Sequence, residues 1–454
     1  MPVQTIQLSH LGEDFDLLQL HRLDPGRYPY LLQSVVQGTP QSRYDILFAF
    51  PGERISAAPE GAQSFLHRLD HHWLNAQVAD EADTLALPFR GGWFLYLAYE
   101  LAGEIEPGLR LSQSNEALPT AFATRIPAAL IIDHEQGCLH LVAEAGKEAS
   151  RQMALMAADL NKTEGQGIGA APPDIHSVTE DPPQRYLDGV ARIKQYIIDG
   201  DVFQVNLSRR WSLELGEGVS ASQLFERLRR HNPAPFAALI EEEGGAVISS
   251  SPERLIEVRG GRISTRPIAG TRPRGEDAEA DQRYSETLLQ HPKEQAEHVM
   301  LIDLERNDLG RVCQPGSVEV DELMVLESYA HVHHIVSNVS GQLRQGVSPG
   351  EVIAAVFPGG TITGCPKVRC MEIIQELEQT ARGPYTGSLG YLNHNGDMDL
   401  NILIRTMYKE GQRLSFRTGA GIVADSIPER ELEETRTKAK GLLRALGIGD
   451  ALAD

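Results

Sequence analysis

The stretch Asp201-Val-Phe-Gln-Val-Asn-Leu-Ser208 decides the fold class, because apolar and polar residues alternate along it. The odd-numbered residues from Phe203 to Leu207 fall on one face of a strand, and the even-numbered polar residues from Gln204 to Ser208 fall on the other. The alternation predicts a strand with one face in the core and one polar face.

The segments around this strand predict a mixture of helices and strands. The apolar residues of 187–197 recur at helical spacing, and Gly200 ends that helix. Further strands are predicted at 245–250, 254–258 and 401–407, and further helices near 292–306 and 429–445. Helices and strands do not alternate regularly and no internal repeat is present. The order therefore predicts an α+β fold with extensive antiparallel sheet.

The composition changes in one region, at about residues 144–185, where small, polar and proline-rich residues gather. Such a stretch is typical of a linker. The sequence therefore predicts an N-terminal region at 1–165, a linker at 166–184 and a C-terminal domain at 185–454.

The chain has 454 residues, of which 41% are hydrophobic, as in ordinary globular proteins. The formal net charge is −21, from 63 acidic and 42 basic residues, and such a surface repels nucleic acid and anionic lipid. A secretory signal and an apolar stretch of bilayer length are both missing, so we expect a soluble, cytoplasmic protein. Four scattered cysteines argue against a disulfide framework.

Two predicted helices carry paired carboxylates at i, i+3 spacing. Glu294 and Glu297 lie on the first, and Glu431 and Glu434 lie on the last helix, with Lys438 one turn beyond Glu434. Mg²⁺ takes oxygen ligands and needs only one or two protein carboxylates. The alternative to a metal site is that these carboxylates lie on solvated helix faces and form i, i+4 ion pairs. The spacing alone favours this alternative.

Three further motifs leave alternatives open. The glycine-rich run 358–369 fails the Walker pattern, although its backbone N–H groups could hold a carboxylate. One functional imidazole is expected among His331, His333 and His334, because a zinc site would need a third ligand. Arg405 shares the predicted strand face of Asn401, where it either forks onto a carboxylate or lies on the surface of an edge strand.

Taken together and in this order, seven segments resemble the chorismate-utilising enzyme family. They are Asp201–Ser208, Ser250-Ser-Pro-Glu-Arg254, Arg266-Pro-Ile-Ala-Gly-Thr-Arg-Pro-Arg274, Ala296-Glu-His298, Asp303-Leu-Glu-Arg-Asn-Asp308, Gly360-Thr-Ile-Thr-Gly-Cys-Pro-Lys-Val-Arg369 and Gly419-Ala-Gly-Ile-Val423. The resemblance covers residues 185–445 closely and the N-terminal part loosely. It implies an α/β sandwich of two large stacked antiparallel β-sheets with helices outside.

The resemblance also implies roles for individual residues. It assigns Mg²⁺ binding to Glu297 and Glu434, with Glu294 and Glu431 as supporting carboxylates. The carboxylates of chorismate would be held by Tyr385, Arg405, Gly419, Gly421 and Lys438, with Gly270 and Thr271 also in the substrate site. His334 and Thr361 would line the reacting ring, and Glu253 would protonate the leaving 4-hydroxyl. This set is chemically consistent, because chorismate is a dianion and an acid turns hydroxide loss into water loss.

Gln204 indicates the nucleophile. Relatives that add water carry a lysine base at this position, whereas a neutral glutamine cannot deprotonate water at neutral pH. Ammonia is already nucleophilic and is the expected reactant. No cysteine lies in a Gly-x-Cys-x-Gly elbow, so the chain encodes no glutaminase. The resemblance therefore implies a separate glutamine amidotransferase subunit, component II, that supplies ammonia.

Four segments resemble the aminodeoxychorismate synthase group, which aminates chorismate at C4: Ser42-Arg-Tyr-Asp-Ile46, Gln204-Val-Asn-Leu207, Asn232-Pro-Ala-Pro-Phe236 and Ile362-Thr-Gly364. Ala269 is instead the usual residue of anthranilate synthases, which aminate at C2 and eliminate pyruvate. Some aminodeoxychorismate synthases carry there a lysine that attacks C2. We expect component I of aminodeoxychorismate synthase, with anthranilate synthase component I as the alternative.

Gln33 replaces the glutamate that pairs with tryptophan in feedback-regulated anthranilate synthases. A non-catalytic chorismate-binding regulator would be expected to lack Glu253 or the metal carboxylates.

Overall fold

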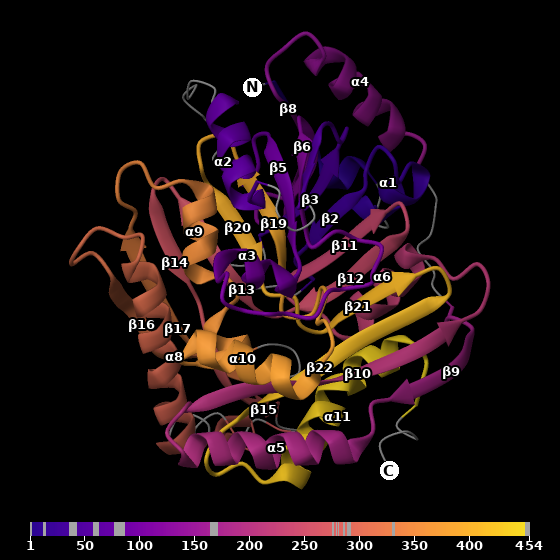
Figure 1. Cartoon of the computed structure of the whole chain (residues 1–454). Coiled ribbons are helices and arrows are strands. Elements are labelled where there is room, and N and C mark those ends of the chain that lie inside the picture. The colour runs from indigo at the N-terminus through magenta and orange to yellow at the C-terminus, as the bar shows by residue number, and fades with distance from the viewer. Residues whose placement is uncertain are drawn as a thin grey trace.

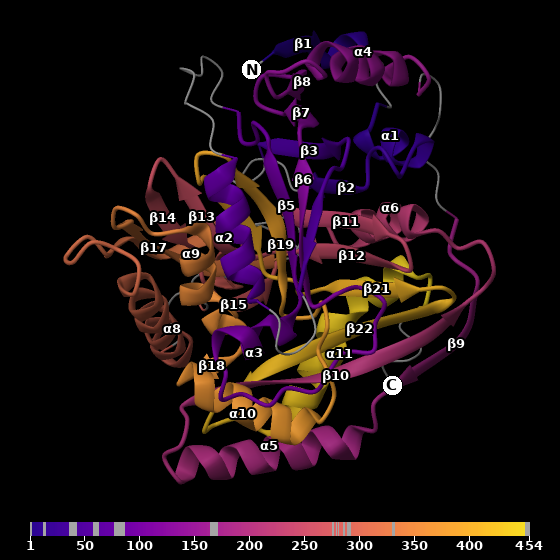
Figure 2. The ribbon, with the colours of Figure 1, turned by 45° about the horizontal axis from the view of Figure 1, so that its top comes forward.

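The computed structural model describes residues 2–11, 15–35, 43–57, 63–76, 87–163, 171–274, 277, 279, 281–284, 287, 292–328 and 332–449. Two large sheets, in which the described neighbouring strands pair antiparallel, form the body of the molecule, and helices lie on their outer sides (Figures 1 and 2). The predicted α+β sandwich is confirmed.

The first sheet runs through the N-terminal and C-terminal parts of the chain. Its strand order is β1 (Val3–Gln7), β8 (Cys138–Ala143), β7 (Ala128–Asp133), β3 (Tyr44–Ala49), β2 (Tyr30–Gln33), β11 (Phe236–Glu242), β12 (Gly245–Ser251), β21 (Thr406–Glu410), β22 (Arg413–Ile422), β10 (Gln204–Leu215) and β18 (Gly364–Cys365), and β9 (Ile175–Glu180) pairs with β10. The two parts of the chain meet where β2 pairs with β11.

The second sheet is also assembled from both parts. Its order is β15 (Ile268–Pro273), β17 (Val332–Gln342), β14 (Arg262–Thr265), β13 (Arg254–Arg259), β20 (Met398–Asn401), β19 (Ser388–Asn393), β5 (Gly92–Leu97), β6 (Ala121–Ile126) and β4 (Arg54–Ser56), and β16 (Glu319–Ser328) pairs with β17. Here the junction is the pairing of β5 with β19, so both sheets depend on contacts between residues far apart in the sequence.

The described helices are α1 (Leu17–Leu23), α2 (Phe65–Asn75), α3 (Ala102–Ile105), α4 (Ala149–Leu160), α5 (Pro183–Ile198), α6 (Ala221–His231), α8 (Pro292–Gly310), α9 (Pro349–Val356), α10 (Lys367–Glu378) and α11 (Pro428–Ala445), with 3-10 turns at η1 (Leu8–His10), η3 (Tyr99–Leu101) and η4 (Gly360–Ile362). Helices α5, α10 and α11 lie together at the lower side of the molecule, next to β10 and β22 (Figures 1 and 2). Among the described helices, none has the length and apolar character needed to cross a membrane.

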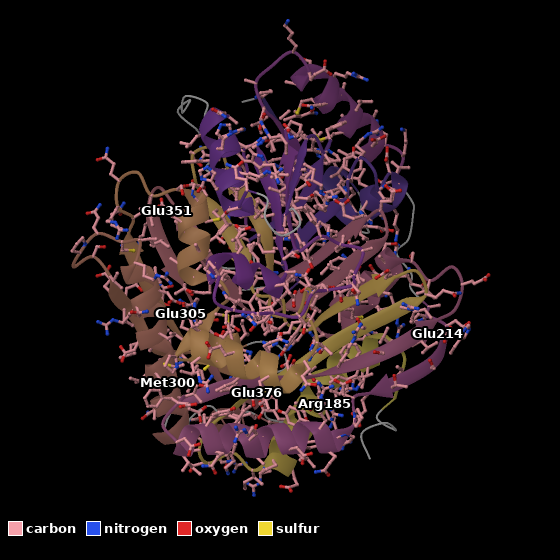
Figure 3. The ribbon with its side chains drawn as sticks, viewed as in Figure 1. Arg185, Glu214, Met300, Glu305, Glu351 and Glu376 are labelled. Carbon is pink, nitrogen blue, oxygen red and sulfur yellow. The ribbon has the colours of Figure 1, made fainter. Side chains whose placement is uncertain are left out.

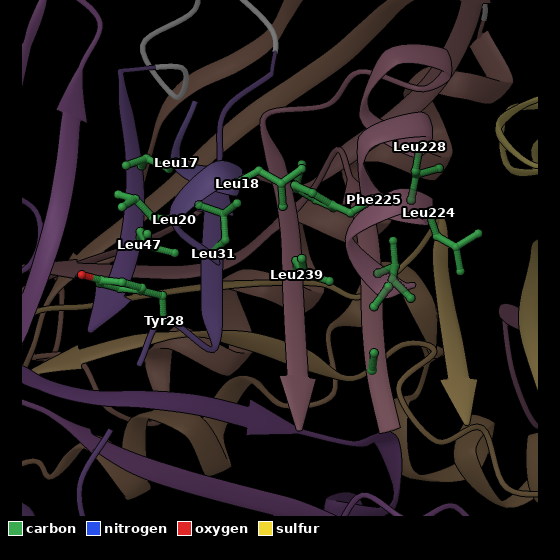
Figure 4. Close-up of a cluster of buried hydrophobic side chains, with 14 of the residues drawn as sticks. Leu17, Leu18, Leu20, Tyr28, Leu31, Leu47, Leu224, Phe225, Leu228 and Leu239 are labelled. Atoms are coloured by element: carbon green, nitrogen blue, oxygen red, sulfur yellow. The ribbon is translucent and has the colours of Figure 1, made fainter. Parts of the chain in front are cut away.

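Three large clusters of buried side chains hold these layers together. One packs the first sheet against α1, α4, α6 and α11, and Figure 4 shows Leu31 and Leu239 of neighbouring strands facing the helix residues Leu18 and Phe225. A second packs the other sheet against α2, α8 and α9. The third lies between the sheets, where the rings of Tyr30 and Phe94 stack with centroids 4.1 Å apart.

Local details differ from the sequence predictions at three places. The strand after α5 begins at Gln204, and Phe203 is 67% exposed instead of buried, because the chain is still turning out of the helix there. The predicted strand at 401–407 is broken between β20 and β21, and Arg405 has the left-handed backbone angle φ of 52°. Residues 175–180, within the predicted linker, form β9 because β10 offers a free edge. The four cysteines form no disulfide.

Candidate active site

Glu253 follows β12 and lies buried between the two sheets. Its carboxylate accepts a hydrogen bond from Thr361 Oγ1 at 2.8 Å and another from the Ile268 backbone N–H. Burial raises the pKa of Glu253 to about 7, although both hydrogen bonds and the charges of Lys438 and Arg405 act in the opposite direction. A large fraction of this carboxyl is therefore protonated at neutral pH, as a general acid requires.

Thr361 is held in place by the glycine-rich turn that contains η4. A Cβ on Gly360 would come within 2.4 Å of a Leu304 side-chain carbon on α8, so the lack of a side chain at Gly360 lets the turn pack closely against that helix. Thr363 Oγ1 donates to the Gly359 carbonyl at 2.8 Å and fixes the other side of the turn. The glycines thus serve to position Thr361 beside Glu253.

Arg405 lies close to Glu253, and His334 lies close to Arg405. His334 is buried on β17, and its ring forms a hydrogen bond with the backbone of Gly270, which has a φ of 70° at a bulge of β15. Burial, aided by the charge of Arg405, lowers the pKa of His334 to about 4. The imidazole is therefore neutral at physiological pH, and Arg405 supplies the positive charge.

A second group of predicted residues meets where β22 pairs with β10. Gly421 lies opposite Asn206, and a Cβ on Gly421 would come within 2.2 Å of Gln204 Nε2. A Cβ on Gly419 would lie 2.7 Å from Tyr385 Oη, and the Gly419 carbonyl accepts a hydrogen bond from Lys438 at 3.0 Å. The two glycines leave the room that these side chains occupy.

Gln204 is buried, and its side-chain oxygen accepts no hydrogen bond from the part of the protein that the structure describes. The same is true of the side-chain oxygen of Asn206, two residues further along the same face of β10. Buried polar atoms normally have a partner. These two oxygens leave hydrogen-bonding capacity on one face of β10 that the described part of the chain does not use.

The predicted metal carboxylates are partly placed. Glu434 forms an ion pair with Lys438 at 2.8 Å, as the i, i+4 spacing predicts. The hydroxyl of Tyr186 is buried and its pKa is raised by burial first and then by Glu431 and Glu434, so both carboxylates lie near it. Glu297 is half-buried on α8, whereas the side chain of Glu294 lies outside the described part, as does His331.

The carboxylates on α8 and α11 have only part of what a metal site requires. Within the described ranges, no three His, Cys, Asp or Glu side chains are close enough together to form a metal site by themselves. The two α11 carboxylates nevertheless have the oxygen chemistry that Mg²⁺ takes, and Mg²⁺ commonly binds to one or two carboxylates together with its substrate. The metal assignment stays a prediction.

Two buried charge clusters support the site and were not singled out from the sequence. In the first, Lys367 Nζ contacts Asp308 at 2.6 Å, and Glu305 (Figure 3) lies beside the Gly360 turn. Burial, followed by the charge of Asp308, raises the pKa of Glu305 to about 8. The signal was present in the segment 303–308, where Glu305 and Asp308 are three residues apart and so share one helix face.

In the second cluster, Glu378 at the end of α10 pairs with Arg382 at 2.7 Å and with Arg417 at 2.9 Å. Arg382 also donates to the Asn206 carbonyl at 2.8 Å, and its guanidinium carbon lies 5.6 Å from the centre of the Tyr385 ring. This network fixes Tyr385 against β10. Glu378 and Arg382 are four residues apart in the sequence, but no sequence pattern brings Arg417 to them.

The structure therefore gathers most of the predicted residues around one region. Glu253, Thr361, His334 and Arg405 form one side, and the β10–β22 group with Tyr385 and Lys438 forms the other. Lys438 connects the sides, since its charge acts on Glu253. On β15, Ala269 pairs with Ile335 and Thr271 with His334, while the side chains of Ala269 and Thr271 lie outside the described part.

Comparisons with known proteins identify the family of the chain. The family model described as chorismate binding enzyme matches residues 31–444. The chain is 41% identical over 425 residues to the anthranilate synthase component I-like protein of Synechocystis, covering 92% of this chain and 86% of that protein. It is 42% identical over 398 residues to aminodeoxychorismate synthase component 1 of Bacillus subtilis, covering 84% and 82%.

Solved structures show the same fold. Anthranilate synthase component I from Streptococcus pneumoniae superposes with a TM-score of 0.78 at 30% identity, covering 90% of this chain and 93% of that chain. The menaquinone-specific isochorismate synthase of Escherichia coli superposes with a TM-score of 0.73 at 20% identity, covering 98% and 94%, which shows a shared fold. The extent of the family match and these identities lead to one conclusion: the chain belongs to the chorismate binding enzyme family.

Proposed function

We propose that this chain is component I of aminodeoxychorismate synthase. It would aminate chorismate at C4 with ammonia from a separate glutaminase subunit. The product, 4-amino-4-deoxychorismate, would serve 4-aminobenzoate and folate synthesis. The observation that carries the choice of ammonia over water is Gln204, a buried, neutral side chain with an unsatisfied acceptor at the site. The choice of C4 rests on the four segments that resemble the aminodeoxychorismate synthase group. A carboxamide cannot deprotonate water, but it can accept a hydrogen bond from ammonia.

Substrate binding would rest on the positive groups around the site. Chorismate carries two carboxylates, and Arg405 and Lys438 offer charge while Tyr385 and the backbone of the β22 glycines offer hydrogen bonds. Mg²⁺ held by Glu434 and Glu297, with Glu431 and Glu294 in support, would neutralise further negative charge when bound. The neutral His334 would orient the ring without adding charge.

Amination would combine bond formation at C4 with acid catalysis. The nitrogen lone pair of ammonia forms the new C–N bond, and the C4–O bond breaks as Glu253 gives its proton to the departing oxygen. Water leaves, and the proton lost by the new amine restores the acid. Thr361 keeps the Glu253 carboxyl aimed at that oxygen. Since alanine occupies position 269, the displacement proceeds directly at C4 or through a nucleophile other than lysine.

Anthranilate synthase component I is the second candidate. Ala269 favours it, and so do relatives of about 40% identity that carry this name, such as the Thermus thermophilus protein at 42% identity over 370 residues. That reaction would use the same acid and the same ammonia, but it would place nitrogen at C2 and release pyruvate.

Product analysis separates these functions. The protein is incubated with chorismate, Mg²⁺ and ammonium at alkaline pH, where free ammonia is abundant, and the products are resolved by chromatography. We expect 4-amino-4-deoxychorismate, which an added aminodeoxychorismate lyase converts to 4-aminobenzoate. Anthranilate with an equal amount of pyruvate would establish the second candidate. Isochorismate would exclude both ammonia reactions, and lack of turnover would favour a regulator.

A further inference from the structure

Arg382 lies buried in the turn between α10 and β19, and its side chain makes a complete set of hydrogen bonds. A guanidinium has five N–H donors in one plane. Two of them pair with Glu378, from Nε at 3.0 Å and from Nη2 at 2.7 Å. The other three go to the Asn206 carbonyl at 2.8 Å, the Ile362 carbonyl at 3.2 Å and Thr386 Oγ1 at 3.3 Å. All five donors are therefore taken by the protein, and none remains for a substrate.

Each of the last three acceptors lies close in the chain to a residue of the site. One directly follows Thr361, whose hydroxyl donates to Glu253 at 2.8 Å. One directly follows Tyr385, and one lies two residues after Gln204 on β10. A single side chain thus contacts the turn that aims the acid, the turn that carries a predicted substrate ligand, and the strand of the expected ammonia acceptor.

The N-terminal part of the chain holds Arg382 in place. The guanidinium carbon lies 4.9 Å from the centre of the Tyr99 ring and 5.6 Å from that of Tyr385, where a cation is attracted to the ring. Glu100 accepts hydrogen bonds from the backbone N–H of Arg382 at 2.7 Å and from that of Gly383 at 3.2 Å. Both the backbone and the guanidinium are therefore fixed before any substrate binds.

We propose that Arg382 is a positioning residue for the amination of chorismate, an inference that rests on the proposed function. It keeps the turn of Thr361 and the ring of Tyr385 at fixed places relative to β10. Because the reacting groups come from these three segments, a shift of one against another misaligns the acid and the incoming nitrogen. A misplacement of about 1 Å can lower a rate about 100-fold.

The test replaces Arg382 by lysine, which keeps the charge opposite Glu378 but has only three donors and no planar fork. Arg125→Lys is the matched control. Arg125 also joins two strands, since it donates to the carbonyls of Gly92 at 3.0 Å and Ile126 at 2.9 Å, and neither is a residue of the site. Steady-state rates are measured with chorismate, Mg²⁺ and ammonium, and every aminated product is counted. Chorismate binding is measured by calorimetry with Mg²⁺ present.

We expect kcat to fall at least about tenfold in Arg382→Lys, because the acid and the nitrogen are no longer aligned. Chorismate affinity should fall about threefold or more, since Tyr385 loses its neighbour. Arg125→Lys should keep kcat and affinity within about twofold, as for a substitution away from the site. Thermal unfolding of both variants shows whether a loss of stability alone accounts for the difference.

A double variant separates positioning from a general structural effect. If Arg382 acts through the turn of Thr361, the loss of kcat in Arg382→Lys/Thr361→Val should be smaller than the product of the two single losses. Once the turn has shifted, the hydrogen bond from Thr361 to Glu253 has little left to contribute. Losses that simply multiply would show that Arg382 does not act through this turn.

A second pair of variants leaves the buried charges unaltered. Tyr99→Leu removes the ring beside the guanidinium, whereas Tyr99→Phe keeps the ring and loses only a hydroxyl that has no hydrogen-bond partner in the described part of the chain. We expect kcat to fall about threefold or more in Tyr99→Leu and to stay within about twofold in Tyr99→Phe. This comparison decides the question even if Arg382→Lys does not fold.

The inference is overturned if Arg382→Lys keeps its kcat, if Arg125→Lys loses as much, or if Tyr99→Phe is as damaging as Tyr99→Leu. Failure of the proposed function gives a different result, because the unaltered protein then forms no aminated product with ammonium. In that case calorimetry still decides whether Arg382 positions Tyr385. A weakened chorismate affinity in Arg382→Lys would support this role, and an unchanged affinity would exclude it.

Discussion

Replacing Glu253 by glutamine should remove the general acid and, at alkaline pH, stabilise the protein. Glutamine keeps the size of the side chain and can still accept the Thr361 hydrogen bond, but it has no proton to give. Loss of a general acid typically lowers the rate by about 10²- to 10⁴-fold. We expect a fall of that size in kcat, with a much smaller change in KM.

The gain in stability follows from the raised pKa. Burial raises the pKa of Glu253 from 4.5 to about 7, and a tenfold change in acidity is worth about 1.4 kcal/mol, so the buried charge costs about 3 kcal/mol. In the unfolded chain the carboxyl ionises above pH 4.5, whereas in the folded protein it resists ionisation up to about pH 7. The contribution of Glu253 to the free energy of unfolding is therefore complete at low pH. It is lost as the pH rises from the pKa of the unfolded chain to that of the folded protein.

Urea unfolding of both proteins at pH 5 and pH 8.5 tests this reasoning. Relative to the unaltered protein, Glu253→Gln should gain about 2–3 kcal/mol more unfolding free energy at pH 8.5 than at pH 5. Glu214→Gln, at an exposed carboxylate on β10, serves as the control. Its unfolding free energy should differ from that of the unaltered protein by the same amount at both pH values. If Glu253→Gln shows no extra gain at pH 8.5, the carboxyl is not held by burial in its neutral form.

Three further substitutions probe the rest of the site. Thr361→Val removes the hydrogen bond to Glu253 and should lower kcat about tenfold, whereas Thr361→Ser should recover most of the rate in steady-state assays. Gly421→Ala places a Cβ 2.2 Å from Gln204 Nε2, so product formation with ammonium should fall at least about tenfold while the thermal unfolding midpoint changes by only a few degrees. Glu434→Ala should abolish Mg²⁺-dependent turnover, and the same substitution should weaken Mg²⁺ binding measured by calorimetry with chorismate present.

Each of these three predictions would be contradicted by a specific result. Equal rates for Thr361→Val and the unaltered enzyme would show that Glu253 is aimed without that hydrogen bond. A large loss of stability in Gly421→Ala would mean that the glycine serves the sheet and not the side chain of Gln204. Full turnover in Glu434→Ala would remove the metal assignment.

The sequence by itself determined the local elements and the family. Alternation along 204–208 and helical spacing along 187–197 report which faces are apolar, and these patterns depend only on neighbouring residues. The resemblance could be recognised from the motifs because glycines and acidic residues must occupy fixed positions along the chain. Those positions form the turn around Thr361 and the pair of carboxylates on α11. The helices at 292–306 and 429–445 were predicted to within a few residues for the same reason.

Only the tertiary structure decided which of these residues act together. Glu253, Thr361 and Arg405 come from three separate segments, and their proximity depends on strand pairing between distant parts of the chain. The raised pKa of Glu253 and the lowered pKa of His334 arise from burial, which no local pattern specifies. The exposure of Phe203 was likewise decided by the point at which β10 begins to pair. Local periodicity fixes the direction of a side chain along its own element, whereas the packing of the sheets and helices determines what that side chain meets.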